Sequence, residues 1–170
     1  MVVTAKGERE KIRRKAGMRN FVFNRYMLLR YMLSFLFIAN IYWVFLLVDS
    51  GWKMIVPVVL LVLGALSMFE HIRLYGKLET DITGELRFNQ LFFIVQIAVN
   101  TTMIGVSLLG VGFSRFFPFL ETAFEARAFM SGVLAVGGWL SLGSLKRILR
   151  IKSGTDKYLK SILEMKRGFR

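Results

Sequence analysis

Residues 31–48 read YMLSFLFIANIYWVFLLV, a run of apolar and aromatic residues that is almost free of polar side chains and carries no charge. A helix needs about 20 predominantly apolar residues to cross the hydrocarbon core of a bilayer, and this run approaches that length. Arg30 precedes the run, and Asp49, Ser50 and Gly51 follow it. The stretch therefore predicts a transmembrane helix and an integral membrane protein.

Three further apolar runs follow, at about residues 54–69, 91–113 and 128–145. The second run is short, and Pro57 lies in its first turn, where a missing backbone N–H is tolerated. Because only residues 49–53 separate the first two runs, these two helices should form an antiparallel hairpin. The sequence thus predicts an all-α fold, a bundle of four transmembrane helices within residues 31–145.

The positive charges are distributed unevenly between the segments that connect these runs. Residues 1–30 hold nine of the 24 Lys and Arg residues, residues 70–90 hold three and residues 146–170 hold nine. Only Lys53, Arg115 and Arg127 lie elsewhere. Cytoplasmic loops of membrane proteins carry the excess of Lys and Arg, so both termini are expected in the cytoplasm, with the spans in the plasma membrane.

The composition excludes several classes of protein and site. A nucleic-acid-binding protein would also be basic, as this chain is with a net charge of +13, but it would not place most of its length in uncharged apolar runs. The chain has no cysteine, and His71 is its only histidine. Disulfides, thiolate chemistry and a multi-histidine metal site within one copy are therefore excluded, and we expect no nucleic-acid partner and no cofactor.

Both terminal segments combine basic residues with apolar ones. In residues 1–30, aromatic residues lie beside Arg19 and Arg25, which suggests an interfacial helix that leads into the first span. In residues 146–170, Thr155 suits the N-cap of a short amphipathic helix. The apolar face of that helix would comprise Tyr158, Leu159, Ile162 and Leu163. Such basic segments are expected to lie on the anionic inner leaflet, although a protein partner could use the same face.

Five basic residues flank the spans closely enough to contact lipid headgroups. Long Lys and Arg side chains at such positions can follow the apolar surface while their charged heads reach the lipid phosphates. The residues are Arg25, Arg30, Lys146, Arg147 and Arg150.

The third run is the most polar of the four. Gln96 and Asn100 are four residues apart and hence share one helical face. Amides facing lipid are costly when unpaired, so this face should point into the bundle or into an oligomer interface, with Asn40 of the first run as its expected partner. Two interpretations remain open at this point: hydrogen bonds between helices, or a polar pathway for a solute.

Small residues recur along the fourth run. Ser131, Ala135 and Gly138 follow a helical spacing, and Gly137 and Ser141 form a small-xxx-small pair. Such residues let helix backbones approach closely. They indicate packing within the chain, self-association or contact with a partner subunit.

The connection at residues 114–127 is rich in phenylalanine, with Phe116, Phe117, Phe119 and Phe124. Solvated loops rarely hold so many large apolar side chains. The segment is expected either to lie in the headgroup region, where aromatic residues are favoured, or to form a docking surface for another membrane protein.

Few residues suggest chemistry. Glu70, His71 and Arg73 meet at the end of the second run, but adjacent residues of a helix point apart. Apart from Asp81 and Glu85, no second titratable cluster accompanies them. No phosphate-binding loop, dinucleotide-binding turn, zinc-protease motif or nucleophile elbow is present. Ion pumps normally need a charged residue deep in a span, and the predicted spans contain none. We also predict no catalytic residue.

Residues 16–26, AGMRNFVFNRY, together with Leu28-Leu29-Arg30-Tyr31 and Ala39-Asn40-Ile41-Tyr42-Trp43, resemble a group of small Gram-positive membrane proteins. Some of these are labelled as membrane subunits of a sugar (cellobiose) phosphotransferase system. The resemblance covers less than a third of the chain and includes no mechanistic motif. It implies a multi-span membrane protein and assigns no functional residue.

These observations favour a non-enzymatic accessory, regulatory or assembly subunit that binds another membrane protein or its own copies. The third and fourth spans and the phenylalanine-rich connection would supply its binding surfaces. An oligomeric transporter or channel for small solutes is the alternative, and an enzyme that acts on lipid is a third hypothesis.

Overall fold

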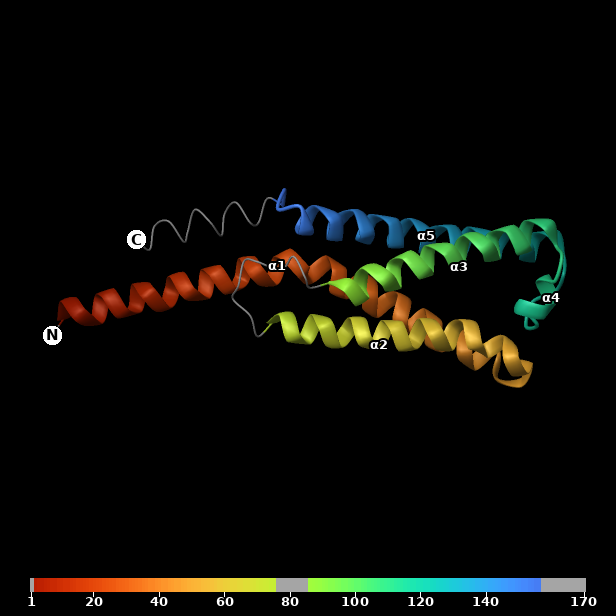
Figure 1. Ribbon diagram of the computed structural model, residues 1–170, viewed down its shortest axis with the longest axis horizontal. Coiled ribbons are helices and arrows are strands. Elements are labelled where there is room, and N and C mark those ends of the chain that lie inside the picture. The colour runs from red at the N-terminus through yellow and green to blue at the C-terminus, as the bar shows by residue number, and fades with distance from the viewer. Residues whose placement is uncertain (1, 76–85, 157–170) are drawn as a thin grey trace.

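The computed structural model describes residues 2–75 and 86–156, and all regular structure within them is helical (Figure 1). The elements are α1 (Val2–Leu46), the 3-10 helix η1 (Val48–Met54), α2 (Ile55–Tyr75), α3 (Arg87–Leu109), α4 (Phe113–Phe116) and α5 (Phe124–Lys152). Four segments are long and apolar enough to cross a membrane: Phe23–Leu46, Val48–Leu74, Arg87–Leu109 and Phe124–Lys152. The predicted all-α protein with four spans is thus confirmed, and the chain is a multi-pass membrane protein.

Helix α1 runs without a break through the boundary expected near residue 30. The sequence predicts an interfacial helix in residues 1–30. The N-terminal half of α1 is helical, continues directly into the first span and extends beyond the other helices (Figure 1). The sequence explains this continuity, because Val2–Leu46 contains no proline and only isolated glycines. The amphipathic helix expected around residues 158–163 lies outside the described residues.

The third and fourth spans differ from the predicted ones at their boundaries. Helix α3 ends at Leu109 rather than near residue 113, because Gly110 adopts a left-handed φ of 72° at its C-cap and Gly112 a φ of 76°. The chain then forms the short helix α4. Helix α5 begins at Phe124, inside the predicted connection, because Ala123 has the extended backbone of an N-cap residue.

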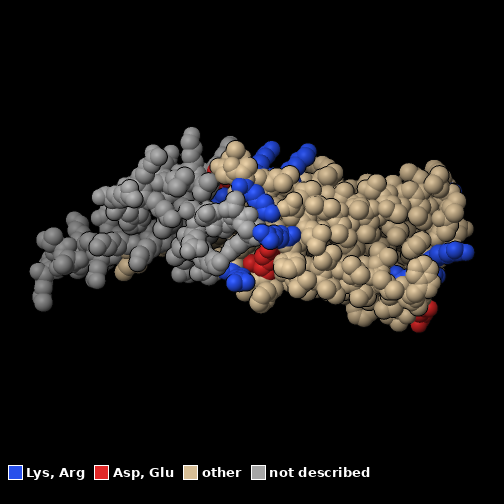
Figure 2. Space-filling view, in the orientation of Figure 1, with Lys and Arg blue, Asp and Glu red and all other residues tan. Residues whose placement is uncertain are grey.

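The four long helices pack in the cyclic order α1, α2, α3, α5, so that α5 returns to α1. Helix α3 makes its largest interface with α5, whereas α1 and α5 touch least among the four neighbouring pairs. Helix η1 and helix α4 lie at one end of the bundle, here called the turn end. The other end carries Arg25, Arg73, Arg87 and Lys146–Lys152 and is called the basic end (Figures 1 and 2).

The interior contains two apolar clusters separated by a polar layer. The cluster towards the basic end comprises Tyr26, Leu29, Leu33, Leu36, Leu74, Leu86, Phe92, Phe93, Ile148 and Ile151. The cluster towards the turn end comprises Met103, Phe113, Phe117 and Leu134. Asn40, Gln96 and Asn100 are buried between the two clusters, near the middle of the spans.

Candidate functional site

A cavity of about 320 Å³ lies between α1, α3 and α5 at the level of the polar layer. Apolar side chains dominate its walls, and the side chains of Asn40, Gln96 and Asn100 also line it. Phe35 on α1 and Val133 and Val136 on α5 line the cavity and are each about half exposed, at 57%, 48% and 56%. The cavity therefore opens sideways, between the two helices that touch least, towards the region where lipid would lie.

The three amides form a chain of hydrogen bonds with a defined direction. Asn40 Nδ2 donates to the carbonyl oxygen of Leu36 and to Gln96 Oε1, both at 2.9 Å. Gln96 Nε2 donates to Asn100 Oδ1 at 3.0 Å. Because a backbone carbonyl can only accept, the Leu36 oxygen fixes which end of each amide donates. The structure thus brings Asn40 to the shared face of Gln96 and Asn100, the pairing that the sequence predicts.

This chain leaves hydrogen-bonding groups without a partner among the described residues. Asn40 Oδ1 and Asn100 Nδ2 bond to no protein atom, although both residues are only 3% exposed. The indole Nε1 of Trp43, another residue of the cavity wall, is also buried without a partner. The cavity therefore offers at least one free acceptor and one free donor within an otherwise apolar site.

Gly137 on α5 makes room for the end of the amide chain. A Cβ atom at this position would lie 2.9 Å from Asn100 Nδ2, closer than packed side chains approach. Ser141 is fully buried, and its hydroxyl donates to the carbonyl oxygen of Gly137 at 2.8 Å. A Cβ atom added at Gly138 would lie 3.9 Å from the Asn100 Cβ. This part of the small-residue face is therefore used for packing α5 against α3 within the chain.

The other two residues of that predicted face lie elsewhere. Ala135 is exposed, and Ser131 is half-buried with its hydroxyl bound to the Arg127 carbonyl oxygen at 2.8 Å. Helical geometry explains why some of these small residues are buried and others are exposed. Together they cover a wider face of α5 than one neighbouring helix can contact. Gly137 and Gly138 lie against Asn100 of α3, and Ser141 is buried one turn further along α5.

Replacing Gly137 with valine is expected to destabilise the bundle by about 1–3 kcal/mol, because the new side chain would overlap the Asn100 amide. The measurement is the thermal midpoint of the detergent-solubilised protein, read from the fraction that remains soluble and monodisperse. Gly132 is the matched control, since it lies on the same helix and a Cβ there would meet nothing within 4 Å. Equal destabilisation by G132V would show that valine in α5, rather than the contact with Asn100, causes the loss.

The phenylalanine-rich connection is divided between the interior and the surface. Phe117 is fully buried, stacks on Trp43 with 6.2 Å between ring centroids, and contacts Phe113 at 5.2 Å. Phe116 is half-buried against the same apolar cluster. The hypothesis of a docking surface is thus wrong for Phe117, because helix α4 turns this side chain inward. Phe119 and Phe124 remain exposed, at 40% and 72%.

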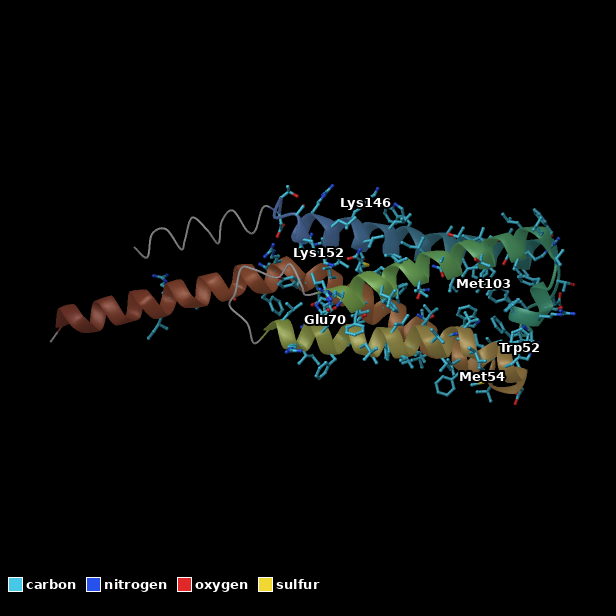
Figure 3. All side chains as sticks on the ribbon, viewed as in Figure 1. Trp52, Met54, Glu70, Met103, Lys146 and Lys152 are labelled. Atoms are coloured by element: carbon cyan, nitrogen blue, oxygen red, sulfur yellow. The ribbon has the colours of Figure 1, made fainter. Side chains whose placement is uncertain are left out.

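Glu70 serves as the cap of α3. Its carboxylate accepts hydrogen bonds from the backbone N–H groups of Arg87 at 2.8 Å and Asn89 at 3.0 Å, and from Asn89 Nδ2 at 2.8 Å. Figure 3 shows Glu70 where α2 meets the start of α3. A carboxylate at this position satisfies orphan donors and complements the helix dipole. The structure thus gives Glu70 a structural role, which the sequence reading of the Glu70, His71 and Arg73 group did not identify.

The five predicted headgroup residues have different surroundings. Arg25 is buried, at 3% exposure, and its Nε lies 2.7 Å from Asp156 Oδ2, while its Nη2 donates to the Ile151 carbonyl oxygen at 3.3 Å. The headgroup assignment is therefore wrong for Arg25, because an acid 131 positions away reaches it. The Arg30 guanidinium lies over the rings of Phe23 and Tyr31, at 5.4 Å from each.

The remaining three headgroup residues lie on the last two turns of α5. Lys146 and Arg150 are exposed, and Arg147 is half-buried and donates to the Arg25 carbonyl oxygen at 3.2 Å.

Within the described residues, no group of three His, Asp or Glu side chains lies close enough to hold a metal ion. Comparisons of the chain with protein-family models, with curated proteins and with solved structures find no match.

Proposed function

We propose that this chain is a non-enzymatic accessory or assembly subunit that binds a transmembrane helix of another membrane protein along α1 and α5, with a polar side chain of that helix in the cavity. One observation carries the proposal: Asn40 Oδ1 and Asn100 Nδ2 line a laterally open cavity and have no partner among the described residues. Inside a bilayer no bulk water can satisfy such groups, so an occupant that pairs with them is favoured.

The depth of the cavity favours a protein helix over a lipid as the occupant. Asn100 lies near the middle of α3 and Gly137 near the middle of α5, where neighbouring lipids present only hydrocarbon chains. A free acceptor and a free donor in the same cavity match a side-chain amide or hydroxyl on a partner helix. Such interhelical hydrogen bonds contribute about 0.6 kcal/mol on average and up to about 1–2 kcal/mol, enough to select a partner without binding it irreversibly.

The surface proposed here differs from the one that the sequence favours. Gly137, Gly138 and Ser141 pack against α3, and Phe117 packs into the apolar cluster at the turn end, so these residues are occupied within the chain. The α1–α5 seam is the part of the polar layer that the chain leaves open. Apolar clusters lie on both sides of this layer, which counts against a hydrated solute path through a single copy.

The orientation belongs to the same proposal. The basic end would face the cytoplasm of a bacterial cell and the turn end the outside of its plasma membrane, because 21 of the 24 Lys and Arg residues lie in residues 1–30, 70–90 and 146–170, whose described parts adjoin the basic end. The basic residues at that end would contact the anionic inner leaflet.

Site-specific photo-crosslinking in native membranes tests the proposal. A photoreactive amino acid at Phe35 or Val133 should form an adduct with one defined membrane protein, whereas the same group at Val62, exposed on α2, should not. Replacing both Asn40 and Asn100 with leucine should reduce that adduct severalfold. The matched control is Thr101→Leu, since Thr101 is exposed and bonds its hydroxyl to the Ile97 carbonyl oxygen.

Two outcomes would overturn the proposal. Adducts from Phe35 and Val133 that contain only lipid, or only a second copy of this chain, would assign the cavity to a different occupant. An adduct that forms equally well without the two asparagine amides would show that the unpaired groups do not select the partner.

A further inference from the structure

A second cavity, of about 630 Å³, lies at the basic end beside the last turns of α5. Lys146, Arg147 and Arg150 line one side of it, together with Thr155 and Asp156 from the turn that follows the helix. Figure 2 shows Lys and Arg side chains gathered at this end of the molecule, and Figure 3 places Lys146 and Lys152 on α5 there.

The charges around this cavity are strongly unbalanced. Among the described residues, Asp156 is the only acidic residue that lines this cavity, and its carboxylate is already paired with the buried guanidinium of Arg25 at 2.7 Å. The ammonium of Lys146 and the guanidinium of Arg150 are exposed and form no ion pair or hydrogen bond within the described residues. Two cations without a partner among the described residues, Lys146 and Arg150, therefore line a cavity whose acidic side chain, Asp156, is already paired.

The ion pair between Arg25 and Asp156 also fixes the position of the end of α5, which carries the cations. Arg147 donates to the carbonyl oxygen of Arg25 at 3.2 Å, and Arg25 binds Asp156 and the Ile151 carbonyl oxygen. The hydroxyl of Thr155 lies 2.8 Å from that of Ser153. These contacts tie α1, the end of α5 and the following turn together, so that the cavity is bounded by fixed backbone.

Part of the cavity lining is apolar. Leu28 of α1 is 42% exposed, and Gly143, one turn of α5 nearer the middle of the span than Arg147, leaves open space where a Cβ atom would stand. An occupant can thus place an anionic group against the cations and extend an apolar chain past Leu28 along the span. This arrangement matches a phosphate group carried by a membrane lipid.

We propose that this cavity binds a phosphate group at the membrane surface, with Lys146 and Arg150 pairing with the phosphate oxygens. Cationic side chains at a membrane surface recognise anionic headgroups by such charge-assisted hydrogen bonds. The site lies on the same side of α1 and α5 as the first cavity, about two helical turns nearer the basic end, and the two cavities share no lining residue.

Native mass spectrometry of the purified full-length chain tests the site, with short-chain phosphatidylglycerol, short-chain phosphatidylcholine and inorganic phosphate as separate probes. The double variant K146Q/R150Q should bind the preferred probe about 10- to 30-fold more weakly than the natural chain. The matched control is R73Q/R87Q, which removes two exposed charges from the same end outside this cavity and should bind as the natural chain does.

The three probes distinguish the sources of the phosphate. Preference for phosphatidylglycerol would assign the site to an anionic lipid. Equal binding of both lipids would assign it to a lipid phosphodiester of any net charge. Binding of inorganic phosphate alone would assign it to a soluble phosphate. The proposal is overturned if no probe binds the natural chain, or if the two double variants lose binding equally.

Discussion

Replacing Phe117 with alanine is expected to destabilise the protein by about 2–4 kcal/mol, because the substitution leaves a cavity in the apolar cluster at the turn end. Phe117 is fully buried, and its ring contacts the rings of Trp43, Phe113 and Phe119. No single neighbour can refill that volume, since the cluster joins α1 to helix α4 and the turn after it. The measurement is the thermal midpoint of the detergent-solubilised protein, compared with that of the natural chain.

Phe124→Ala is the matched control for this prediction. Phe124 belongs to the same phenylalanine-rich stretch but is 72% exposed on the first turn of α5, so its loss should change stability by no more than about 0.5 kcal/mol. If instead F117A leaves the midpoint unchanged while it abolishes binding of a membrane partner, then Phe117 acts as a docking residue and its burial is not structural.

The existence of the four spans could be predicted because hydropathy and length alone determine which segments can cross a bilayer. The pairing of Asn40 with Gln96 could be predicted for a related reason. Polar side chains in a span must find partners, and few candidates exist in so apolar a chain. Both predictions depend on the properties of the bilayer as a solvent and need no knowledge of how the helices are arranged.

The misassigned residues depend on arrangement instead. Whether Phe117 or Phe124 faces inward follows from the turn after Gly110 and Gly112, whose positive φ angles the hydropathy pattern does not reveal. Glu70 caps α3 because the end of α2 lies beside the start of α3. The sequence between the two helices has no apolar periodicity from which this contact could be predicted. The lateral cavity follows from the loose contact between α1 and α5, a property of packing that no local pattern carries.

The ion pair between the buried Arg25 and the partly buried Asp156 should give the largest charge-dependent loss of stability in the described part of the chain. Replacing Asp156 with asparagine leaves the guanidinium of Arg25, only 3% exposed, without its counter-charge. Removing one partner of a buried pair typically costs about 3–5 kcal/mol, because the remaining charge is buried and unpaired. The thermal midpoint of D156N, measured beside that of the natural chain, checks this expectation.

Two further variants separate the ion pair from a general effect of charge. Glu121→Gln removes an exposed acid at the turn end and should leave the midpoint nearly unchanged, because surface charges contribute little. The double variant R25M/D156N removes both charges and should recover much of the stability that D156N loses, since no buried charge then remains unpaired. Equal midpoints for D156N and the natural chain would mean that the end of α5 is not held to α1 by this pair. The cationic side of the phosphate cavity would then lack the support that Arg25 is inferred to give it.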